Sequence, residues 1–147
     1  MEALEQACDS RSYDSLTLLL FDIDDFKRIN DSYGHLVGDE LICQLVQRVA
    51  TLLPEGAVFA RVGGEEFCIL QLGMTESGTQ KLARSLLLSV GQAPFSTKVG
   101  ELPLSISIGA VYADPGSRDP LSVLADADRL MYQVKASGRN NLLFRRF

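Results

Sequence analysis

The chain has 147 residues, the size of one domain with a single hydrophobic core, so no second domain is expected. Hydrophobic residues make up 46% of the sequence and charged residues 22%, a globular composition that excludes a disordered chain, a collagen-like repeat and a disulfide scaffold. The net charge of -5 lacks the basic surplus that drives non-specific binding to nucleic acid or anionic membranes, so a polyanionic ligand would need a local basic patch or a metal ion.

The cysteines and the apolar runs indicate a cytoplasmic domain. Cys8, Cys43 and Cys68 are odd in number, lie far apart and include no C-x-x-C pair, which favours a reducing compartment. The longest apolar run, residues 16–21, is far shorter than the ~20 residues of a membrane-spanning helix, and no signal peptide precedes it. A membrane anchor would have to lie elsewhere in a longer protein.

The first half of the chain predicts one strand and two helices. Residues 16–21 form an apolar run that ends in an acidic cluster within residues 22–25, a pattern typical of a buried central strand. A short helix is expected over residues 25–33. Between Gly38 and Pro54, apolar side chains recur at helical spacing, which predicts a long amphipathic helix.

A hairpin and two further helix–strand units complete the pattern. The apolar runs 57–62 and 67–72 flank Gly-Gly-Glu-Glu and predict a β-hairpin whose tip carries two acids. A helix is expected over about residues 77–90 and a strand over residues 102–112, in which Gly109 suggests a bulge. The last elements are a helix from Pro120 to the cap-like Gly138 and a closing strand over residues 141–147.

This order of elements predicts the fold class. It corresponds to an α/β fold, an α+β sandwich with a ferredoxin-like βαββαβ core and an extra terminal strand. The first crossover should make strands one and two parallel. Residues 1–147 are expected to form one domain.

Two acidic clusters are expected to lie close together, because the end of the first strand and the hairpin tip belong to strands that should be neighbours. Asp22 and Glu65 would then offer the carboxylate oxygens that Mg²⁺ prefers, with phosphates and waters completing its coordination. The simpler interpretation is that both are solvated loop acids. The hairpin favours a metal site, because two glycines before two acids are expected where the backbone closely approaches another group.

Several motifs in register resemble the GGDEF family of diguanylate cyclases. They are F-D-I-D-D-F-K-R-I-N-D at 21–31, Y-G-H at 33–35, G-D at 38–39, R-V-G-G-E-E-F at 61–67, S-I-S-I-G at 105–109, A-D-A-D at 125–128, M-Y at 131–132 and K-A-S-G-R-N at 135–140. The resemblance extends from about residue 16 to residue 141. It implies a fold related to nucleotidyl cyclases and polymerase palms, and the condensation of two GTP molecules into cyclic di-GMP with release of two pyrophosphates.

The resemblance also implies a metal site and catalytic residues. Asp22, the carbonyl of Ile23 and Glu65 are expected to hold Mg²⁺ or Mn²⁺, and Glu65 to take the proton of the attacking hydroxyl. Glu66 is a second candidate, as a ligand of another ion, as the base, or as a residue that holds the turn. Lys27 is a candidate for stabilising the transition state, although a lysine on a surface helix is usually just solvated.

The substrate-binding residues implied by the resemblance contact the phosphates or the base. Phosphate contacts are expected from Lys135 and Arg139, although cations are common at helix C-termini for electrostatic reasons alone. The residues expected near guanine are Phe26, Asn30, His35 and Asp39. Without the motif, Asn30 would be interpreted as a turn cap and Asp39 as the cap of the long helix. His35 is either a base-pocket residue or a structural one.

The sequence departs from the family pattern in two places. Feedback-inhibited members carry an R-x-x-D motif that ends five residues before the first glycine of the hairpin, where this chain has Pro54 and Ala57. The product-inhibition site is therefore expected to be absent. The family's usual N-terminal D-x-L-T segment and N-R-R turn are also missing before Met1, so residues 1–14 are interpreted as the remnant of a connecting helix.

The expected partners follow from this reaction. They are GTP, cyclic di-GMP and a second copy of the domain in a transient homodimer, with no nucleic acid and with a sensory or regulatory domain outside this chain. Alternatives are a silent product receptor, a catalytically weak GTP-binding module, a generic ferredoxin-like interaction module and a cyclase that acts on a single nucleotide.

Overall fold

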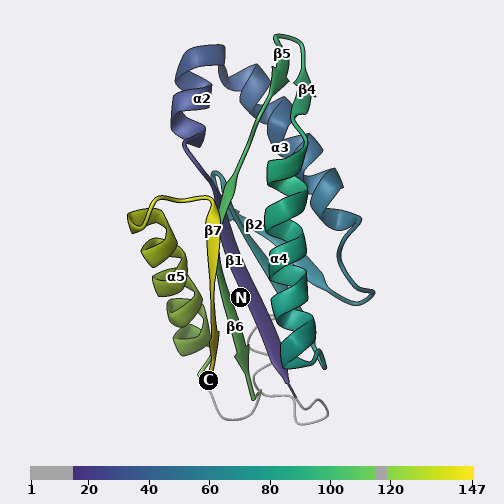
Figure 1. Cartoon of the computed structure of the whole chain (residues 1–147), viewed down its shortest axis with the longest axis vertical. Helices are drawn as coiled ribbons and strands as arrows, with labels where there is room; N and C mark the ends of the chain where they lie inside the picture. The colour runs from purple at the N-terminus through teal and green to yellow at the C-terminus, as the bar shows by residue number, and fades with distance from the viewer. Residues whose placement is uncertain (1–14, 115–118) are drawn as a thin grey trace.

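A five-stranded sheet in the order β2-β3-β1-β6-β7 organises the computed structural model, which describes residues 15–114 and 119–147 (Figure 1). A separate two-stranded sheet pairs β4 with β5. The elements in chain order are β1 (Leu16–Ile23), α2 (Phe26–Tyr33), α3 (His35–Ala50), β2 (Val58–Gly63), β3 (Glu66–Leu72), α4 (Glu76–Gln92), β4 (Phe95–Thr97), β5 (Gly100–Leu102), β6 (Ile106–Ala113), α5 (Pro120–Ala136) and β7 (Asn141–Arg146). The predicted α/β fold class is confirmed.

The first two strands of the chain have the relative direction that the expected crossover gives them, but a third strand lies between them. β1 pairs antiparallel with β3 and β6, β2 pairs antiparallel with β3, and β7 pairs parallel with β6. The first two strands of the chain therefore run in the same direction, as predicted, but β3 lies between them. This arrangement makes β1 the central strand, and all eight of its residues are buried.

Helices cover both faces of the sheet (Figure 1). The α3 and α4 side holds the larger apolar cluster, in which side chains such as Leu45 and Leu86 pack with Phe21 and Phe67 of the strands. On the other face, α5 packs its own apolar side chains on the alternate residues of β1. Because β1 alternates between these two clusters, its end is fixed in position from both sides.

Gly109 is not a bulge, and that expectation was wrong. The pairing of β1 with β6 continues without a shift through Leu20 opposite Gly109. A Cβ at Gly109 would lie 2.1 Å from the carbonyl oxygen of Ala127 and 2.7 Å from the amide nitrogen of Met131. The glycine is therefore required because the backbone of α5 approaches the sheet closely at this residue.

The β4–β5 hairpin was not predicted, and the strand expected over residues 102–112 begins later, at Ile106. The hairpin is held against α3 by three polar side chains spaced four residues apart. Glu40 accepts a hydrogen bond from the backbone of the hairpin turn, and Gln44 donates one to a backbone carbonyl of β4. Arg48 donates to carbonyls at the end of α4 and just after it, with its guanidinium 3.6 Å from the centre of the Phe95 ring. An apolar periodicity cannot predict this support because it is polar.

The long helix begins earlier than the sequence predicted. α3 starts at His35, with Gly34 as its N-cap, so Gly38 lies inside the helix rather than before it. The alternative interpretation of Asp39 as the cap of this helix is therefore wrong. Apart from the strand expected over residues 102–112, the other predicted helices and strands are confirmed, with boundaries that differ by no more than two residues.

Two of the three cysteines fall within the described residues, and both Cys43 and Cys68 are free thiols. No helix within residues 15–114 or 119–147 is long and apolar enough to cross a membrane. The interpretation of residues 1–14 as a helix remnant lies outside the described residues.

Candidate functional site

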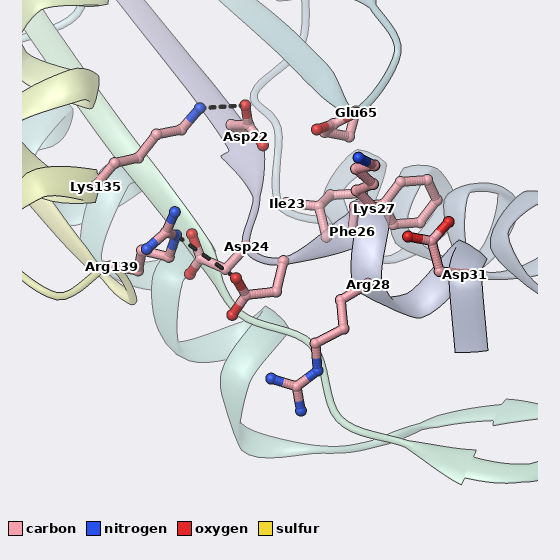
Figure 2. A pocket seen from close by; sticks show the side chains of 11 residues that line it. Asp22, Ile23, Asp24, Phe26, Lys27, Arg28, Asp31, Glu65, Lys135 and Arg139 are labelled. Atoms are coloured by element: carbon pink, nitrogen blue, oxygen red, sulfur yellow. Dashed lines mark hydrogen bonds and ion pairs between the residues drawn. The ribbon is translucent and has the colours of Figure 1, made fainter. Parts of the chain in front are cut away.

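Two backbone connections bring the acids of β1 and of the β2–β3 tip together. Asp22 lies opposite Glu66 in the strand register, and the amide of Ile23 donates a 3.1 Å hydrogen bond to the carbonyl of Glu65. The tip is further held by Arg61, whose Nε donates to the carbonyl of Gly64 at 2.6 Å. The predicted proximity of Asp22 and Glu65 is therefore present, and Figure 2 shows their side chains next to each other.

Asp22 and Glu65 line an open cleft of about 410 Å³. Its walls come from the end of β1, the first turns of α2, the hairpin tip and the end of α5. The lining residues are Asp22, Ile23, Asp24, Asp25, Phe26, Lys27, Arg28, Asp31, Glu65, Lys135 and Arg139. Seven of the residues selected from the sequence are among them, namely Asp22, Ile23, Phe26, Lys27, Glu65, Lys135 and Arg139.

Asp22 forms an ion pair with Lys135. The distance from Lys135 Nζ to Asp22 Oδ2 is 2.5 Å, and the Asp22 side chain is 10% exposed. Burial raises the pKa of the Asp22 carboxyl, the hydrogen bond and charge of Lys135 oppose that shift, and the charges of Glu65 and Asp24 add to it. The carboxylate is therefore held in an environment where a cation is strongly favoured beside it.

Asp24, to which the sequence motifs assign no role, fixes the architecture of the cleft. Its buried carboxylate accepts hydrogen bonds from the hydroxyls of Ser105 and Ser107, both at 2.6 Å, and from the amide of Asn140 at 2.9 Å. These bonds join the end of β1 to β6 and to the turn that follows α5. The available signal was the spacing: Asp24 follows Asp22 by two residues at a strand end, and Ser105 and Ser107 alternate in the same way.

Left-handed backbone conformations cluster at the same end of the sheet. Among the described residues, the three non-glycine residues with positive φ are Asp25 (55°), Arg139 (64°) and Asn140 (49°). Such conformations are unfavourable for most side chains and persist where the surrounding structure holds them. Here Arg139 Nε lies 3.9 Å from Asp25 Oδ1, and the turn directs the Arg139 side chain into the cleft from the end of α5 (Figure 2).

The beginning of α2 contributes both a cation and backbone amides. Lys27 lines the cleft and is exposed, whereas Phe26 is buried beneath it. The N-cap residue Asp25 makes no side-chain capping bond. The first amides of a helix have no partner within the helix, so those of α2 are available to an anion in this cleft.

The residues expected near the base lie farther along α2 and α3. Asn30 packs against Gly38, where a Cβ would lie 1.9 Å from Asn30 Oδ1, so the glycine makes room for the amide. Asn30 Oδ1 is buried and has no hydrogen-bond partner among the described residues. His35 and Asp39 are exposed on the first turns of α3. None of these three expected base contacts lines the acidic cleft itself.

Glu66 is separated from Glu65 by the alternation of the strand. It lines a second cavity of about 580 Å³ between the hairpin and α5, together with Asp128 and mainly apolar side chains. Burial raises the pKa of the Glu66 carboxyl, and the charges of Asp128 and Asp22 raise it further, against the effect of Lys135. The two glutamates of the hairpin tip therefore face different surroundings.

Replacing Glu66 with glutamine is expected to stabilise the protein at neutral pH. A carboxyl whose pKa is raised by folding destabilises the folded state when ionised, and glutamine imitates its protonated form. At pH 7 we expect a melting temperature about 2 °C higher, a small value because Glu66 is half-buried. The gain should shrink as the pH falls through the raised pKa, since the native carboxyl then becomes protonated.

Thermal unfolding between pH 4 and pH 8 tests this expectation. Glu101→Gln on β5 is the matched control, because it removes an exposed carboxylate far from the second cavity. A Glu66→Gln variant that is less stable than the native protein at pH 7, or equally stabilised at every pH, would contradict the assigned environment.

The donor set of the cleft is compatible with a divalent cation bound together with a phosphate ligand. No group of three or more His, Cys, Asp or Glu side chains close enough to hold a metal occurs in residues 15–114 and 119–147. Asp22, Glu65 and the carbonyl of Ile23 supply two carboxylates and one backbone oxygen. Mg²⁺ commonly binds through one or two carboxylates and completes its shell with phosphate oxygens and waters.

Comparison with known proteins identifies the family. Residues 1–141 match the family model described as "Diguanylate cyclase, GGDEF domain". The response regulator PleD of Caulobacter vibrioides is 38% identical over 130 residues, which cover 86% of this chain and 28% of PleD. Curated relatives of this kind are much longer, and this chain spans 21% to 39% of their length.

Solved structures agree with the sequence match. The GGDEF domain of YfiN from Pseudomonas aeruginosa has a TM-score of 0.87 and 30% identity, covering 99% of this chain and 90% of that one. The GGDEF domain of DgcB from Caulobacter crescentus, solved in complex with c-di-GMP, has a TM-score of 0.89 and 26% identity, covering 97% and 86%. The shared fold, the matching family model and the acids at the strand end together show that this chain belongs to the diguanylate cyclase GGDEF-domain family.

Proposed function

We propose that this domain condenses two GTP molecules into cyclic di-GMP, with Mg²⁺ or Mn²⁺ as the cofactor. The observation that carries the proposal is that one cleft gathers the acids Asp22 and Glu65 and the cations Lys135 and Arg139. Acids for metal ions and cations for phosphates, gathered in one cleft, are what phosphoryl transfer requires.

In each half-reaction, the 3′-hydroxyl oxygen of one GTP attacks the α-phosphorus of the other. A new P–O bond forms, the bond to pyrophosphate breaks, and the hydroxyl proton goes to the carboxylate of Glu65. Asp22, Glu65 and the Ile23 carbonyl would hold the divalent cation, which would lower the pKa of the attacking hydroxyl and offset charge at phosphorus. Glu66 is placed behind Glu65 because it lines the second cavity rather than the cleft.

The triphosphate would be held from two sides. Lys27 would contact it from one side of the cleft, and Lys135 and Arg139 from the other, as their places in Figure 2 indicate. The first amides of α2 would add to the contacts on the Lys27 side. Arginine suits bidentate contact with phosphate oxygens, whereas lysine acts as a point charge. These groups stabilise the charge that moves to the leaving pyrophosphate.

Guanine would be selected by Asn30 and Asp39, with Phe26 and His35 beside it. Guanine offers N–H donors on its Watson–Crick edge, so carboxylate and amide acceptors distinguish it from adenine. The buried Oδ1 of Asn30 supports this assignment because it is an acceptor without a hydrogen-bond partner among the described residues, and a guanine donor would satisfy it.

Two copies of the domain must face each other, because one cleft holds one GTP. The specific activity should therefore rise with protein concentration until the dimer is populated. Incubation with GTP and Mg²⁺, followed by chromatographic identification of the product at several protein concentrations, tests the proposal. A cyclic mononucleotide as the product would favour a cyclase that acts on a single nucleotide. GTP binding without turnover at any protein concentration would favour a GTP-binding module.

We also propose that the product inhibits this domain at most by competing with GTP. The positions that carry the arginine and aspartate of R-x-x-D in feedback-inhibited relatives hold Pro54 and Ala57, whose side chains are uncharged. The amide of Ala57 donates a hydrogen bond to the carbonyl of Pro54. The nearby Arg48 is occupied by three backbone carbonyls. No arginine–aspartate pair is therefore presented at this turn.

Calorimetry with cyclic di-GMP measures this directly. Binding of the product should disappear when a nonhydrolysable GTP analogue saturates the active site. Product binding that persists under saturation would reveal a separate inhibitory site and refute the assignment.

A further inference from the structure

The ion pair between Lys135 and Asp22 has a consequence for how metal ion and nucleotide bind. Lys135 Nζ lies 2.5 Å from Asp22 Oδ2, inside the cleft that holds both side chains. The ammonium therefore occupies a face of the carboxylate that a divalent cation would use.

An ammonium and a divalent cation compete at this carboxylate. The ammonium takes one lone-pair direction of Oδ2, so Mg²⁺, which binds oxygen at about 2.0–2.1 Å, could use this oxygen only with the positive charge of Lys135 close beside it. If the cation took the other oxygen, the two positive charges would still face each other across one partly buried carboxyl group, where solvent screens them poorly. A divalent cation that binds Asp22 therefore either displaces the ammonium of Lys135 or binds more weakly because of its repulsion.

The competition is confined to one side of the site. Among residues 15–114 and 119–147, no ion pair involves Glu65. Arg139, the other cation from this end of the chain, pairs with Asp25 at 3.9 Å and not with Asp22. Lys135 alone among these neighbours blocks an expected metal ligand directly.

Lys135 can move because of its position. It lies in the last turn of α5, its side chain is 30% exposed, and four methylene groups connect the ammonium to the backbone. Leaving Asp22 would cost the ammonium its buried partner unless another anion replaced it. A triphosphate in the same cleft would offer new acceptor oxygens, so the lysine would then exchange one anion for another.

We propose that Lys135 occupies the Asp22 side of the metal site until a nucleoside triphosphate takes its ammonium, so that the divalent cation and the nucleotide bind cooperatively. This inference rests on the proposed function, because that function assigns Asp22 to the metal and the cleft to a triphosphate. The coupling is reciprocal: the nucleotide raises the affinity for the metal ion as much as the metal ion raises the affinity for the nucleotide.

The test measures Mn²⁺ binding to the protein without nucleotide, by the loss of the electron paramagnetic resonance signal of free Mn²⁺. Lys135→Gln should bind Mn²⁺ about tenfold more tightly than the native protein, because the cation then no longer has to displace or repel an ammonium at a partly buried carboxylate. Lys135→Arg keeps the charge and should retain weak binding. Asp22→Asn should lose the site.

Arg139→Gln is the matched control, because it removes one positive charge from the same cleft without touching Asp22. Arg139→Gln should change the affinity for Mn²⁺ by less than about threefold. A general electrostatic effect of charge removal would instead tighten Mn²⁺ binding as much in Arg139→Gln as in Lys135→Gln. Circular dichroism establishes that each variant is folded. A Lys135→Gln variant that binds Mn²⁺ no more tightly than the native protein, or no more tightly than Arg139→Gln, overturns the proposal.

A second titration separates this inference from the proposed function. A nonhydrolysable GTP analogue should raise the Mn²⁺ affinity of the native protein by a larger factor than that of Lys135→Gln, because the variant has no lysine to displace. Equal factors would overturn the inference even if the native domain produces cyclic di-GMP. Failure of the native protein to make cyclic di-GMP, with the coupling intact, would instead reject the reaction.

Discussion

Replacing Glu65 with glutamine is expected to abolish cyclic di-GMP synthesis while leaving the protein folded. Glu65 is half-buried at the hairpin tip and lies outside both apolar clusters, so its carboxylate contributes little to the core. The amide keeps the size of the side chain but loses the charge that holds a metal ion and the basicity that accepts the hydroxyl proton. We expect turnover to fall by at least about 10³-fold, because one substitution removes both contributions.

Initial rates with saturating GTP and Mg²⁺ measure this effect, with Glu101→Gln as the control for loss of an exposed carboxylate outside the cleft. The melting temperature of Glu65→Gln should stay within about 2 °C of the native value, since surface changes usually shift stability by less than about 0.5 kcal/mol. Turnover at native rates would refute the role of Glu65, and so would a loss of stability large enough to explain the inactivity.

The sequence predicted where the acidic side chains lie when residues adjacent in the chain define their positions. Asp22 and Glu65 each follow or precede a strong apolar strand pattern, so their positions at strand ends could be read directly. Their proximity then depended on one pairing, that of β1 with β3, which the structure contains. The motif spacing added Lys135 at the end of α5 and Arg139 just after it, whose positions at the cleft no local pattern could have predicted.

The supporting residues were harder to predict because long-range contacts define them. Asp24 resembles its neighbours in the acidic cluster, and its function as a hydrogen-bond acceptor depends on Ser105 and Asn140, which are more than 80 residues away in the chain. Gly38 resembles a helix boundary in the sequence. Its actual requirement is space for the Asn30 amide, which depends on how α2 packs against α3.

The same limitation applies to the polar contacts that hold the β4–β5 hairpin on α3. Hydrophobic periodicity indicates apolar faces, whereas this contact uses Glu40, Gln44 and Arg48 to bind backbone groups. A three-residue strand such as β4 also gives too few alternating positions for a pattern. The start of α3 was predicted too late for a related reason. Gly38 interrupts the apolar periodicity in the first turn of this helix, so the pattern indicated a helix only after it.

Replacing Gly109 with alanine is expected to destabilise the protein far more than either glutamate substitution changes its stability. The added Cβ would lie 2.1 Å from the carbonyl oxygen of Ala127 and 2.7 Å from the amide nitrogen of Met131, both backbone atoms of α5. A flexible side chain could turn away, but a helix backbone can only shift as a unit or break a hydrogen bond. We expect a loss of about 3 kcal/mol in the free energy of unfolding, at the upper end of the usual cost of overpacking.

The displacement of α5 should also reach the cleft, because the same helix carries Lys135 near its end and Arg139 follows in the next turn. Chemical denaturation measures the loss of stability, and Gly91→Ala is the matched control. Gly91 lies in α4, where the nearest atom to an added Cβ is the Oδ1 of Asn140 at 3.9 Å, so alanine there should be neutral or slightly stabilising. If Gly109→Ala matched that control in stability, the close approach of α5 to β6 would not be a constraint in solution, and the explanation of this glycine would fail.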